Sequence, residues 1–289
     1  MLNPKNHTPW SLVWLASYPK SGNTWFRVFL TNYLRGDDQP AVINQLESSP
    51  IAGERLGFDR LYGIDSADLD LTEIDQRRPA MYQQWQRDDS PWLFHKVHDA
   101  YTYLPDGQAL LGPSAGQAAI YLLRNPLDVA VSFAHHNGQA ELDKTIAKMA
   151  QTQAALANQR GAFNNQLRQQ LLSWSEHVHS WQNAPLPKLI VRYEDLLADP
   201  FATFSQAIRF LQLPDEPERI RKAIAFSDFS VLQQQEQALG FKEKTAMASQ
   251  FFREGKAGGY RAVLTEEQVQ QVMQDHAAVM REWGYVCRH

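Results

Sequence analysis

Residues 18–22 have the sequence YPKSG, in which a lysine, a serine and a glycine follow one another. An apolar run precedes them at 12–16, and apolar residues at helical spacing follow until Gly36. This pattern predicts a strand, a tight loop and a helix. A glycine at a helix start leaves backbone N–H groups free, and Lys20 adds a full positive charge. The stretch therefore predicts an anion site suited to phosphate or sulfate.

The order of these residues differs from the common nucleotide-binding loop. The Walker pattern GxxxxGK[ST] places a glycine before its lysine, whereas here Lys20 precedes Gly22. A simpler interpretation is a Lys–Gly turn that caps a helix and binds nothing. The loop alone does not decide between a ligand site and a cap, so other segments must support one or the other.

A second group of reactive side chains ends the segment 91–98, which has the sequence PWLFHKVH and predicts a strand. In a strand, Lys96 and His98 point to one face and His95 points to the other. His95 and His98 are therefore a poor metal pair, whereas Lys96 and His98 can act on one site. A lone histidine is usually structural, but a lysine two residues before it at a strand end favours acid–base chemistry.

Arginine and serine are combined in the segment 124–132, RNPLDVAVS, directly after the apolar run 117–123. The run predicts a third strand, and the proline stands where helix starts tolerate it. Arg124 at the strand end and Ser132 early in the helix can converge on one anion, because arginine offers a planar fork and serine a hydroxyl. The alternative is that Arg124 pairs with Asp128 in a structural turn.

Two later segments also carry side chains suited to a nucleotide. The apolar pattern 188–193 predicts a fourth strand that ends in Tyr193, and two acidic residues follow it. Tyr193 would otherwise be an ordinary strand-end aromatic. The segment 251–260, FFREGKAGGY, combines glycines with Arg253 and Lys256, so it can surround a phosphate with N–H groups and cations.

The four strand patterns alternate with helical patterns, which predicts an α/β fold with a central, mostly parallel sheet flanked by helices. Such sheets bind ligands at the carboxyl ends of their strands. Because the candidate residues lie at or just after predicted strand ends, one topology gathers them on one edge. No repeat or linker is evident, so residues 1–289 are interpreted as a single domain. The remaining predictions are loops and short helices at 36–79 and helices at 142–156, 167–181, 201–213, 218–226 and 265–283.

Composition excludes several classes of protein. A net charge of −4 favours neither nucleic acid nor an anionic membrane as the main partner. The single cysteine, Cys287, forbids an intrachain disulfide and fits a reducing compartment. We find neither a signal peptide nor an apolar run near the ~20 residues that span a bilayer, so we expect a cytoplasmic protein without a membrane span. The histidines show no compelling metal spacing, so no metal is expected.

Together these motifs resemble the PAPS-dependent sulfotransferases of the cytosolic or bacterial small-molecule type. PAPS is 3′-phosphoadenosine 5′-phosphosulfate, the donor of the sulfonyl group. The resemblance covers about residues 12–265 and is tightest in YPKSGNTW and RNPLDVAVS; KVH at 96–98 and YED at 193–195 support it. It departs at Glu254, where the family usually has lysine, and at 259–260, where Asp-Trp is common. The family's dimer segment fits only at Thr265, so the oligomeric state stays open.

The resemblance implies a P-loop-like phosphosulfate-binding loop and a function for each candidate residue. His98 would be the general base, Lys20 would stabilise the leaving group, and Lys96 would hold the sulfonyl oxygens. Side chains would supply all cations, so no metal is required. The residues implied to contact the donor nucleotide are Lys20, Ser21, Gly22, Asn23, Thr24, Trp25, Arg124, Ser132, Tyr193, Ser227, Phe229, Phe252, Arg253 and Gly255.

The implied reaction is transfer of a sulfonyl group from PAPS to a hydroxyl or an amine of a small-molecule acceptor. Attack is in line at sulfur and releases 3′-phosphoadenosine 5′-phosphate (PAP). Segments around 40–85, 135–170 and 235–250 would form the acceptor pocket, but their sequence does not identify the acceptor. Two other classes stay open: a P-loop phosphotransferase or kinase, which would need the Walker order, and a non-catalytic nucleotide-binding protein of the same fold.

Overall fold

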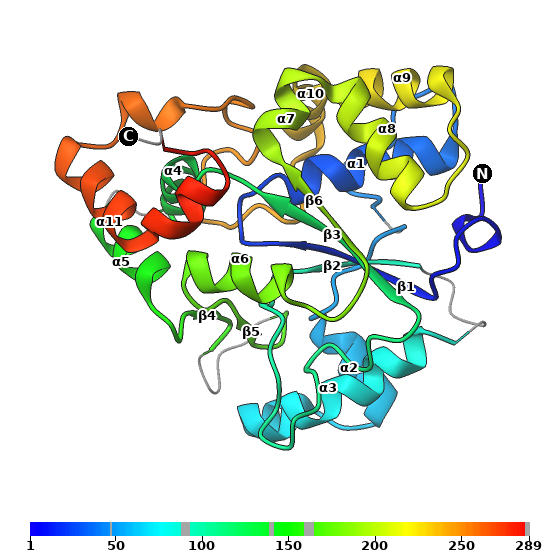
Figure 1. The fold of residues 1–289 in the computed structure, drawn as a ribbon. Coiled ribbons are helices and arrows are strands. Elements are labelled where there is room, and N and C mark those ends of the chain that lie inside the picture. The colour runs from blue at the N-terminus through cyan, green and yellow to red at the C-terminus, as the bar shows by residue number, and fades with distance from the viewer. Residues whose placement is uncertain (47, 88–92, 139–141, 159–164, 287–289) are drawn as a thin grey trace.

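Four parallel strands form the central sheet of the computed structural model, which describes residues 1–46, 48–87, 93–138, 142–158 and 165–286 (Figure 1). Their spatial order is β2-β1-β3-β6, and every neighbouring pair is parallel, which confirms the predicted sheet. These strands are β1 (Leu12–Ser17), β2 (Phe94–Val97), β3 (Gln117–Leu123) and β6 (Lys188–Arg192). A separate antiparallel pair consists of β4 (Ala155–Leu156) and β5 (Gln169–Gln170).

Helices cover both faces of this sheet (Figure 1). All residues of β1 are buried, and because successive side chains point to opposite faces, Trp14 and Leu15 belong to different cores. The core around Leu15 is covered by α1 (Asn23–Arg35), α7 (Tyr193–Ala198), α8 (Pro200–Phe210) and α9 (Pro217–Phe226). The core around Trp14 is covered by α2 (Arg55–Tyr62), α3 (Leu71–Trp85), α4 (Pro126–His136), α5 (Leu142–Ala150), α6 (Trp174–Gln182) and α11 (Glu266–Glu282).

Helix α3 corrects the prediction for the segment that follows the first helix. The loops and short helices predicted for 36–79 are present in part, but α3 begins inside this range and runs to Trp85. Asp70 and Glu73 form a capping box at its start: the side chain of each residue accepts a hydrogen bond from the backbone N–H of the other. The remaining elements are α10 (Phe229–Leu239) and the 3₁₀ turns η1 (Pro4–Asn6), η2 (Ser66–Asp68) and η3 (Gly259–Ala262).

Two other predicted helices are shorter than their apolar patterns. The helix predicted for 142–156 ends at Ala150, and the chain then pairs β4 with β5. The helix predicted for 167–181 begins only at Trp174, where Ser173 and Glu176 form a capping box. In both cases most of the apolar residues are buried, but strand pairing and capping decide where the helix stops or starts.

The strand predicted for 91–98 is observed as β2, and its outer edge is paired. Pro91 and Trp92 lie outside the described residues, as does Cys287. On the side away from β1, the backbone N–H of Lys96 donates to the carbonyl of Pro50 at 2.9 Å, and Ala52 N–H donates to the carbonyl of Lys96 at 2.8 Å. Pro50 and Ala52, in the segment between α1 and α2 (the insertion), therefore pair with the edge strand.

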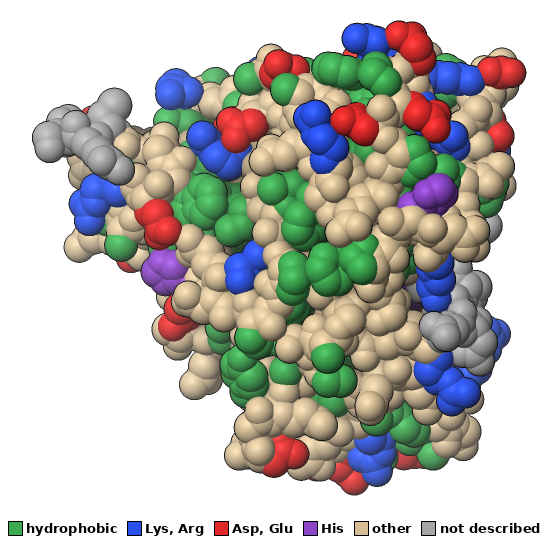
Figure 2. Space-filling view, turned by 45° about the vertical axis from the view of Figure 1, so that its right-hand side comes forward, with side chains coloured by type: hydrophobic (Ala, Val, Ile, Leu, Met, Phe, Trp, Pro, Cys, Tyr) green, Lys and Arg blue, Asp and Glu red, His purple; other side chains and the backbone are tan. Residues whose placement is uncertain are grey.

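The surface carries charges of both signs. On the face drawn in Figure 2, basic and acidic side chains are interspersed across the top of the molecule rather than gathered into one field. A site that binds anions in this protein must therefore have its own local group of positive charges.

Among the described residues, no helix combines the length and the apolar character that a bilayer crossing needs.

Candidate active site

The four central strands end at one edge of the sheet, where the polar candidates gather. The strand partners Ala16 and Val97 lie side by side, as do Leu123 and Arg192, so the strand ends are nearly level. Directly after them the chain enters the loop 18–22, His98, Arg124 and Tyr193. The topology thus brings together residues from four separate segments, as expected for a ligand site in a parallel sheet.

The loop after β1 turns sharply into α1. Lys20 has a positive φ of 69° and Gly22, the residue that caps the helix, has a φ of 99°. A positive φ is uncommon for a residue with a side chain and costs about 1 kcal/mol or more, so contacts around the loop must hold Lys20 there. One such contact joins loop and strand: the side-chain amide of Asn23 donates to the carbonyl of Leu15 at 2.8 Å.

Among the described residues, no acidic side chain forms an ion pair with Lys20. Its Nζ atom lies 3.8 Å from the centre of the Phe251 ring, so its charge rests on an aromatic face. Burial, together with the positive charges of Lys96 and Arg124, lowers the pKa of Lys20 to about 7. A ligand with negative charge would reverse this effect and restore the ammonium form.

Buried donors without partners surround the same loop. Among the described residues, neither Ser21 Oγ nor Arg124 Nε has a hydrogen-bond partner, and the Ser21 side chain is 1% exposed. Buried polar groups are normally paired, so these donors indicate a place for acceptor oxygens. The loop amides, Lys20 and these two donors together fit the phosphate and sulfonate groups of a phosphosulfate.

Arg124 joins the loop to the glycine-rich segment. One guanidinium nitrogen donates to the carbonyl of Lys20 at 3.0 Å, and the other donates to the carbonyl of Lys256 at 3.2 Å. Its guanidinium also lies 4.3 Å from the centre of the Tyr193 ring. Arg124 therefore holds three separate parts of the site in contact.

Asp128 does not pair with Arg124, so the structural-turn alternative is wrong. Its buried carboxylate accepts instead from the N–H groups of Gly258 at 2.8 Å and Tyr260 at 3.1 Å. It thereby fixes the glycine-rich segment against α4. Ser132 lies one helical turn further along α4, half-buried, on the face that Asp128 shares.

His98 is oriented by the end of the neighbouring strand. Its Nδ1 atom lies 2.8 Å from the carbonyl oxygen of Ser17. A carbonyl only accepts, so Nδ1 carries the proton and Nε2 keeps a free lone pair. Within the described part of the chain Nε2 has no hydrogen-bond partner. Burial and the charge of Lys96 lower the pKa of His98 well below its usual value, so the imidazole is neutral at pH 7.

Lys96 is held by a carboxylate that the sequence did not indicate. Its Nζ atom contacts Glu243 at 2.7 Å, and the other Glu243 oxygen contacts Arg27 at 2.5 Å. Burial acts to raise the pKa of Glu243, but the two cations outweigh it and hold that pKa well below its usual range. Glu243 lies in a polar stretch without periodicity, 147 residues from Lys96, so no local pattern could reveal the pair.

Aromatic side chains form the wall beside the loop. The Trp25 indole N–H donates to the carbonyl of Ser227 at 2.9 Å, and its ring meets Tyr193 edge-on at 5.7 Å. A Cβ on Gly22 would lie 2.7 Å from the Tyr193 ring, so glycine allows this close approach. The Ser227 hydroxyl is buried and donates to the carbonyl of Ala223, which leaves its predicted contact with a ligand untested.

The glycine-rich segment packs on this wall through Gly255. A Cβ on Gly255 would lie 2.5 Å from the Phe229 ring, while Phe252 is buried in a separate small core. Glu254, the departure from the family pattern, contacts Arg253 at 2.7 Å and Lys256 at 3.4 Å. The acid thus neutralises part of the charge that the segment offers to a phosphate. The side chain of Thr24 is buried at the start of α1.

His136, at the end of α4, also faces the site. Its ring meets Phe251 edge-on at 6.0 Å, and its buried Nδ1 has no partner among the described residues. Burial, and then the charges of Lys20 and Lys96, lower the pKa of His136 to about 3. The sequence around His136 shows only a histidine near a predicted helix end, so it does not indicate that this residue faces the site. In the described part of the chain, no group of three or more potential ligands could hold a metal.

Comparison with known proteins shows the family and the fold. A family model described as the sulfotransferase domain matches residues 11–284. The chain is 25% identical over 274 residues to a flavonol 3-sulfotransferase of Flaveria bidentis, covering 90% of this chain and 78% of that protein. It is 24% identical to cytosolic sulfotransferase 12 of Arabidopsis thaliana, covering 89% and 74%. A mouse sulfotransferase crystallised with PAP has a similar fold, with a TM-score of 0.58 at 17% identity, covering 94% and 85%.

Proposed function

The chain belongs to the sulfotransferase domain family, and on this premise we propose that it transfers a sulfonyl group from PAPS to a hydroxyl or an amine of a small molecule. PAP bound to a relative of the same fold supports PAPS as the donor. Membership in this family of enzymes also removes the support for the kinase and non-catalytic alternatives. Its relatives include a protein named as cytosolic, which supports a cytoplasmic location.

The observation that carries this proposal is the state of His98. It has a proton on Nδ1, no partner for Nε2 among the described residues and a depressed pKa, and it lies at the strand edge where Lys20 and Lys96 are also placed. A neutral imidazole with a free lone pair is a general base. Two lysines beside it suit a reaction in which negative charge moves from one oxygen to another.

Each residue then has a stated part in the reaction. His98 Nε2 takes the proton of the acceptor hydroxyl as the acceptor oxygen bonds to sulfur. The bond between sulfur and the 5′-phosphate oxygen breaks on the opposite side, and Lys20 with the loop N–H groups stabilises the charge left there. Lys96 turns from Glu243 toward the sulfonyl oxygens. PAP leaves as the second product.

Donor binding is proposed to use the rest of the loop edge. Arg124, Ser132 and the segment from Arg253 to Gly255 hold the 3′-phosphate, and the wall of Trp25, Tyr193 and Phe229 packs against the adenine. Ser21, Gly22, Asn23 and Thr24 present the start of α1 to the 5′-phosphosulfate, where free N–H groups favour anions. Arg253 shares its charge with Glu254, so this part of the site is weaker than a fully basic segment would be.

The test is the variant His98→Ala, assayed for PAP binding and turnover separately. We expect PAP affinity to stay within about twofold while kcat falls at least about a hundredfold, because general-base catalysis contributes roughly that factor. His135→Ala, on α4, is the control: we assign His135 no part in the reaction, so this variant should retain turnover. Unchanged turnover in His98→Ala would remove the base assignment.

A further inference from the structure

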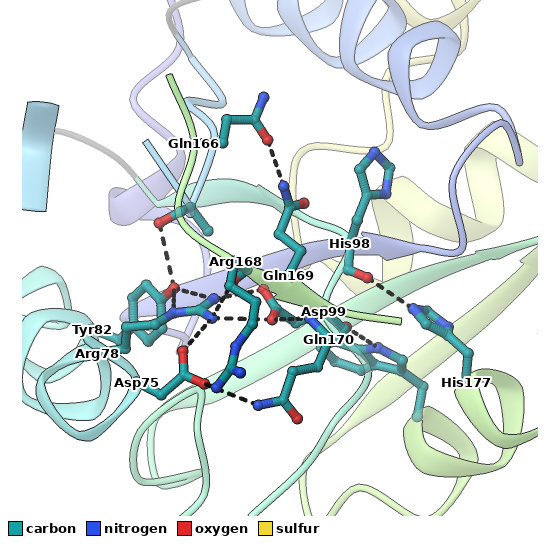
Figure 3. A network of polar contacts seen from close by, with 12 residues as sticks. Asp75, Arg78, Tyr82, His98, Asp99, Gln166, Arg168, Gln169, Gln170 and His177 are labelled. Atoms are coloured by element: carbon teal, nitrogen blue, oxygen red, sulfur yellow. Dashed lines mark hydrogen bonds and ion pairs between the residues drawn. The ribbon is translucent and has the colours of Figure 1, made fainter. Parts of the chain in front are cut away.

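The turn that carries His98 away from β2 is held by α6. The carbonyl of His98 accepts from Nε2 of His177 at 3.1 Å (Figure 3). The carbonyl of Asp99 accepts from the indole N–H of Trp181 at 3.0 Å. His177 and Trp181 are four residues apart and share one face of the helix. One helix face therefore fixes two consecutive carbonyls of the turn.

The contact from His177 has a defined direction. The His98 carbonyl only accepts, so Nε2 of His177 carries the proton and its Nδ1 accepts from the Tyr121 hydroxyl at 2.8 Å. Burial lowers the pKa of His177 to about 4, so it stays neutral and keeps this tautomer. Tyr121 and His177 are both buried, whereas His98 is partly exposed.

A buried ion pair holds the other side of the same turn. Asp99 and Arg78 are both 0% exposed, and the Arg78 fork contacts the two carboxylate oxygens at 3.1 and 2.5 Å. The backbone N–H of Gln170 donates to the same carboxylate at 2.9 Å. Arg78 is fixed in turn by the Tyr82 hydroxyl, one turn further along α3, at 3.0 Å from Nε. Figure 3 shows these groups converging beneath the turn.

Stability alone does not account for this pair. Well-packed apolar residues of similar volume are often as stable as a buried ion pair, because removing two charges from water costs several kcal/mol. A planar arginine fork on a carboxylate does fix geometry, since two parallel hydrogen bonds allow one relative orientation. The pair is one residue from His98, and the imidazole points away from the network (Figure 3).

We propose that Arg78 is a positioning residue for the reaction, which fixes the turn at 98–101 through Asp99 and so directs Nε2 of His98. It does not touch the reacting atoms. This inference rests on the proposed function of His98 as the base. An error of about 1 Å in the position of a catalytic group can cost roughly a hundredfold in rate.

The first variant is Arg78→Lys, which keeps the charge but cannot contact both carboxylate oxygens. We expect kcat to fall about 10- to 100-fold while PAP affinity and the acceptor KM stay within about twofold. The matched control is Arg168→Lys. Arg168 contacts Asp75 in the same network but does not contact Asp99 through its side chain, so we expect kcat to be unchanged.

A double-mutant cycle separates positioning from a general structural effect. In a His98→Ala background, Arg78→Lys should cause no further loss of the residual rate, because the group it positions is absent. An additional loss as large as in the wild type would overturn the proposal. If His98→Ala alone leaves turnover intact, His98 is not the base, and the positioning function proposed for Arg78 is then wrong as well.

A second variant covers the case in which Arg78→Lys does not fold. Arg78→Gln combined with Asp99→Asn leaves no unpaired buried charge, and we expect it to bind PAP normally with the same loss of kcat. Wild-type kcat in either folded variant contradicts the proposal. Failure of both variants to bind PAP would make the pair a requirement for folding and would equally overturn the positioning function.

Discussion

Lys20 is buried and has a strained backbone, and no acidic side chain in the described part of the chain pairs with it. Its φ of 69° and its contact with the Phe251 ring keep the ammonium at the mouth of the loop, and its pKa is lowered to about 7. An ordinary lysine would be paired or exposed. The arrangement suits a group whose charge is needed only when an anion arrives.

The pKa of Lys20 predicts a coupling between ligand binding and protonation. Between pH about 7 and 10.5, Lys20 is protonated in the unfolded chain but neutral in the ligand-free folded protein. The folded protein therefore gains stability as pH rises from about 7 to 10.5, and this gain is absent below pH about 7. PAP restores the charge. At pH about 8.5 we therefore expect uptake of nearly one proton per PAP bound.

Calorimetry in buffers of different ionisation enthalpy measures this uptake. Lys20→Met should bind PAP more weakly and take up no proton. A wild-type binding enthalpy that is the same in every buffer would show that Lys20 is already charged in the free protein.

Residues were predictable where the chemistry lies within one short segment. Lys20, His98 and Arg124 follow apolar strands, and that order is visible in the sequence. Glu243 was not, because its function depends on Lys96 and Arg27, which only the fold brings near. The charge on a distant partner leaves no pattern in the sequence around either residue.

At the scale of elements, the segment 241–252 lies across the site. Glu243 contacts Lys96, Phe251 contacts Lys20, and the Thr245 hydroxyl donates to the carbonyl of His136 at 2.5 Å. The lysine that we propose for the leaving group and the lysine that we propose for the sulfonyl oxygens are thus both contacted by one segment. If Lys96 holds the sulfonyl oxygens as we propose, a sulfonate oxygen and the Glu243 carboxylate compete for its ammonium group.

Glu243→Gln tests that competition. PAPS carries the sulfonyl group and PAP does not, so we expect the variant to bind PAPS roughly tenfold more tightly relative to PAP than the wild type does. Glu254→Gln is the matched control: it should strengthen both ligands equally, because the 3′-phosphate is common to them. Titration of each ligand measures the ratios, and an unchanged ratio in Glu243→Gln would contradict the competition.

At the junction of β1 and α1, the variant Gly22→Ala tests stability and not ligand binding. We expect a loss of about 1–3 kcal/mol in the free energy of unfolding, since a Cβ there meets Tyr193 at 2.7 Å and φ is 99°. Gly107→Ala has a similar φ of 83° with nothing within 4 Å, so it isolates the backbone cost. Urea unfolding of both variants measures the difference; equal losses would show that the ring contact contributes nothing.

Strands were more predictable than helix ends. Gln117–Leu123 is buried throughout, so an apolar run reports it directly. The start of α6 depends on a capping box at Ser173. The residues before it form β5, although the helical spacing of apolar residues extends into them. Local pattern gives the buried face of an element, whereas capping and strand pairing set its limits.

For the whole molecule, β1 and β3 contribute to the cores on both faces of the sheet. Trp14 and Tyr121 belong to one core and Leu15 and Ile120 to the other, so neither core can form without the same strands. We propose on this ground that residues 1–289 are one domain. Shared strands make separate unfolding of the two cores unfavourable.

One cooperative transition is therefore expected in urea. Tryptophan fluorescence and far-ultraviolet circular dichroism should give the same midpoint, as two-state unfolding requires. PAP at about 100 times its Kd should add about 2.7 kcal/mol to the free energy of unfolding, because it binds the folded state. Two separated midpoints would mean that one part of the chain folds independently.

The pairing of Pro50 and Ala52 with Lys96 also bears on aggregation. An exposed edge strand offers unpaired N–H and C=O groups to another chain, and an apolar one such as β2 is a template for intermolecular sheets. Here Pro50 and Ala52 of the insertion pair with the backbone N–H and C=O groups of Lys96. The backbone of Lys96, two residues before His98, is thus shielded from neighbouring molecules by a segment that we also expect to line the acceptor pocket. Shortening that segment to alter acceptor choice would carry a risk of insoluble protein.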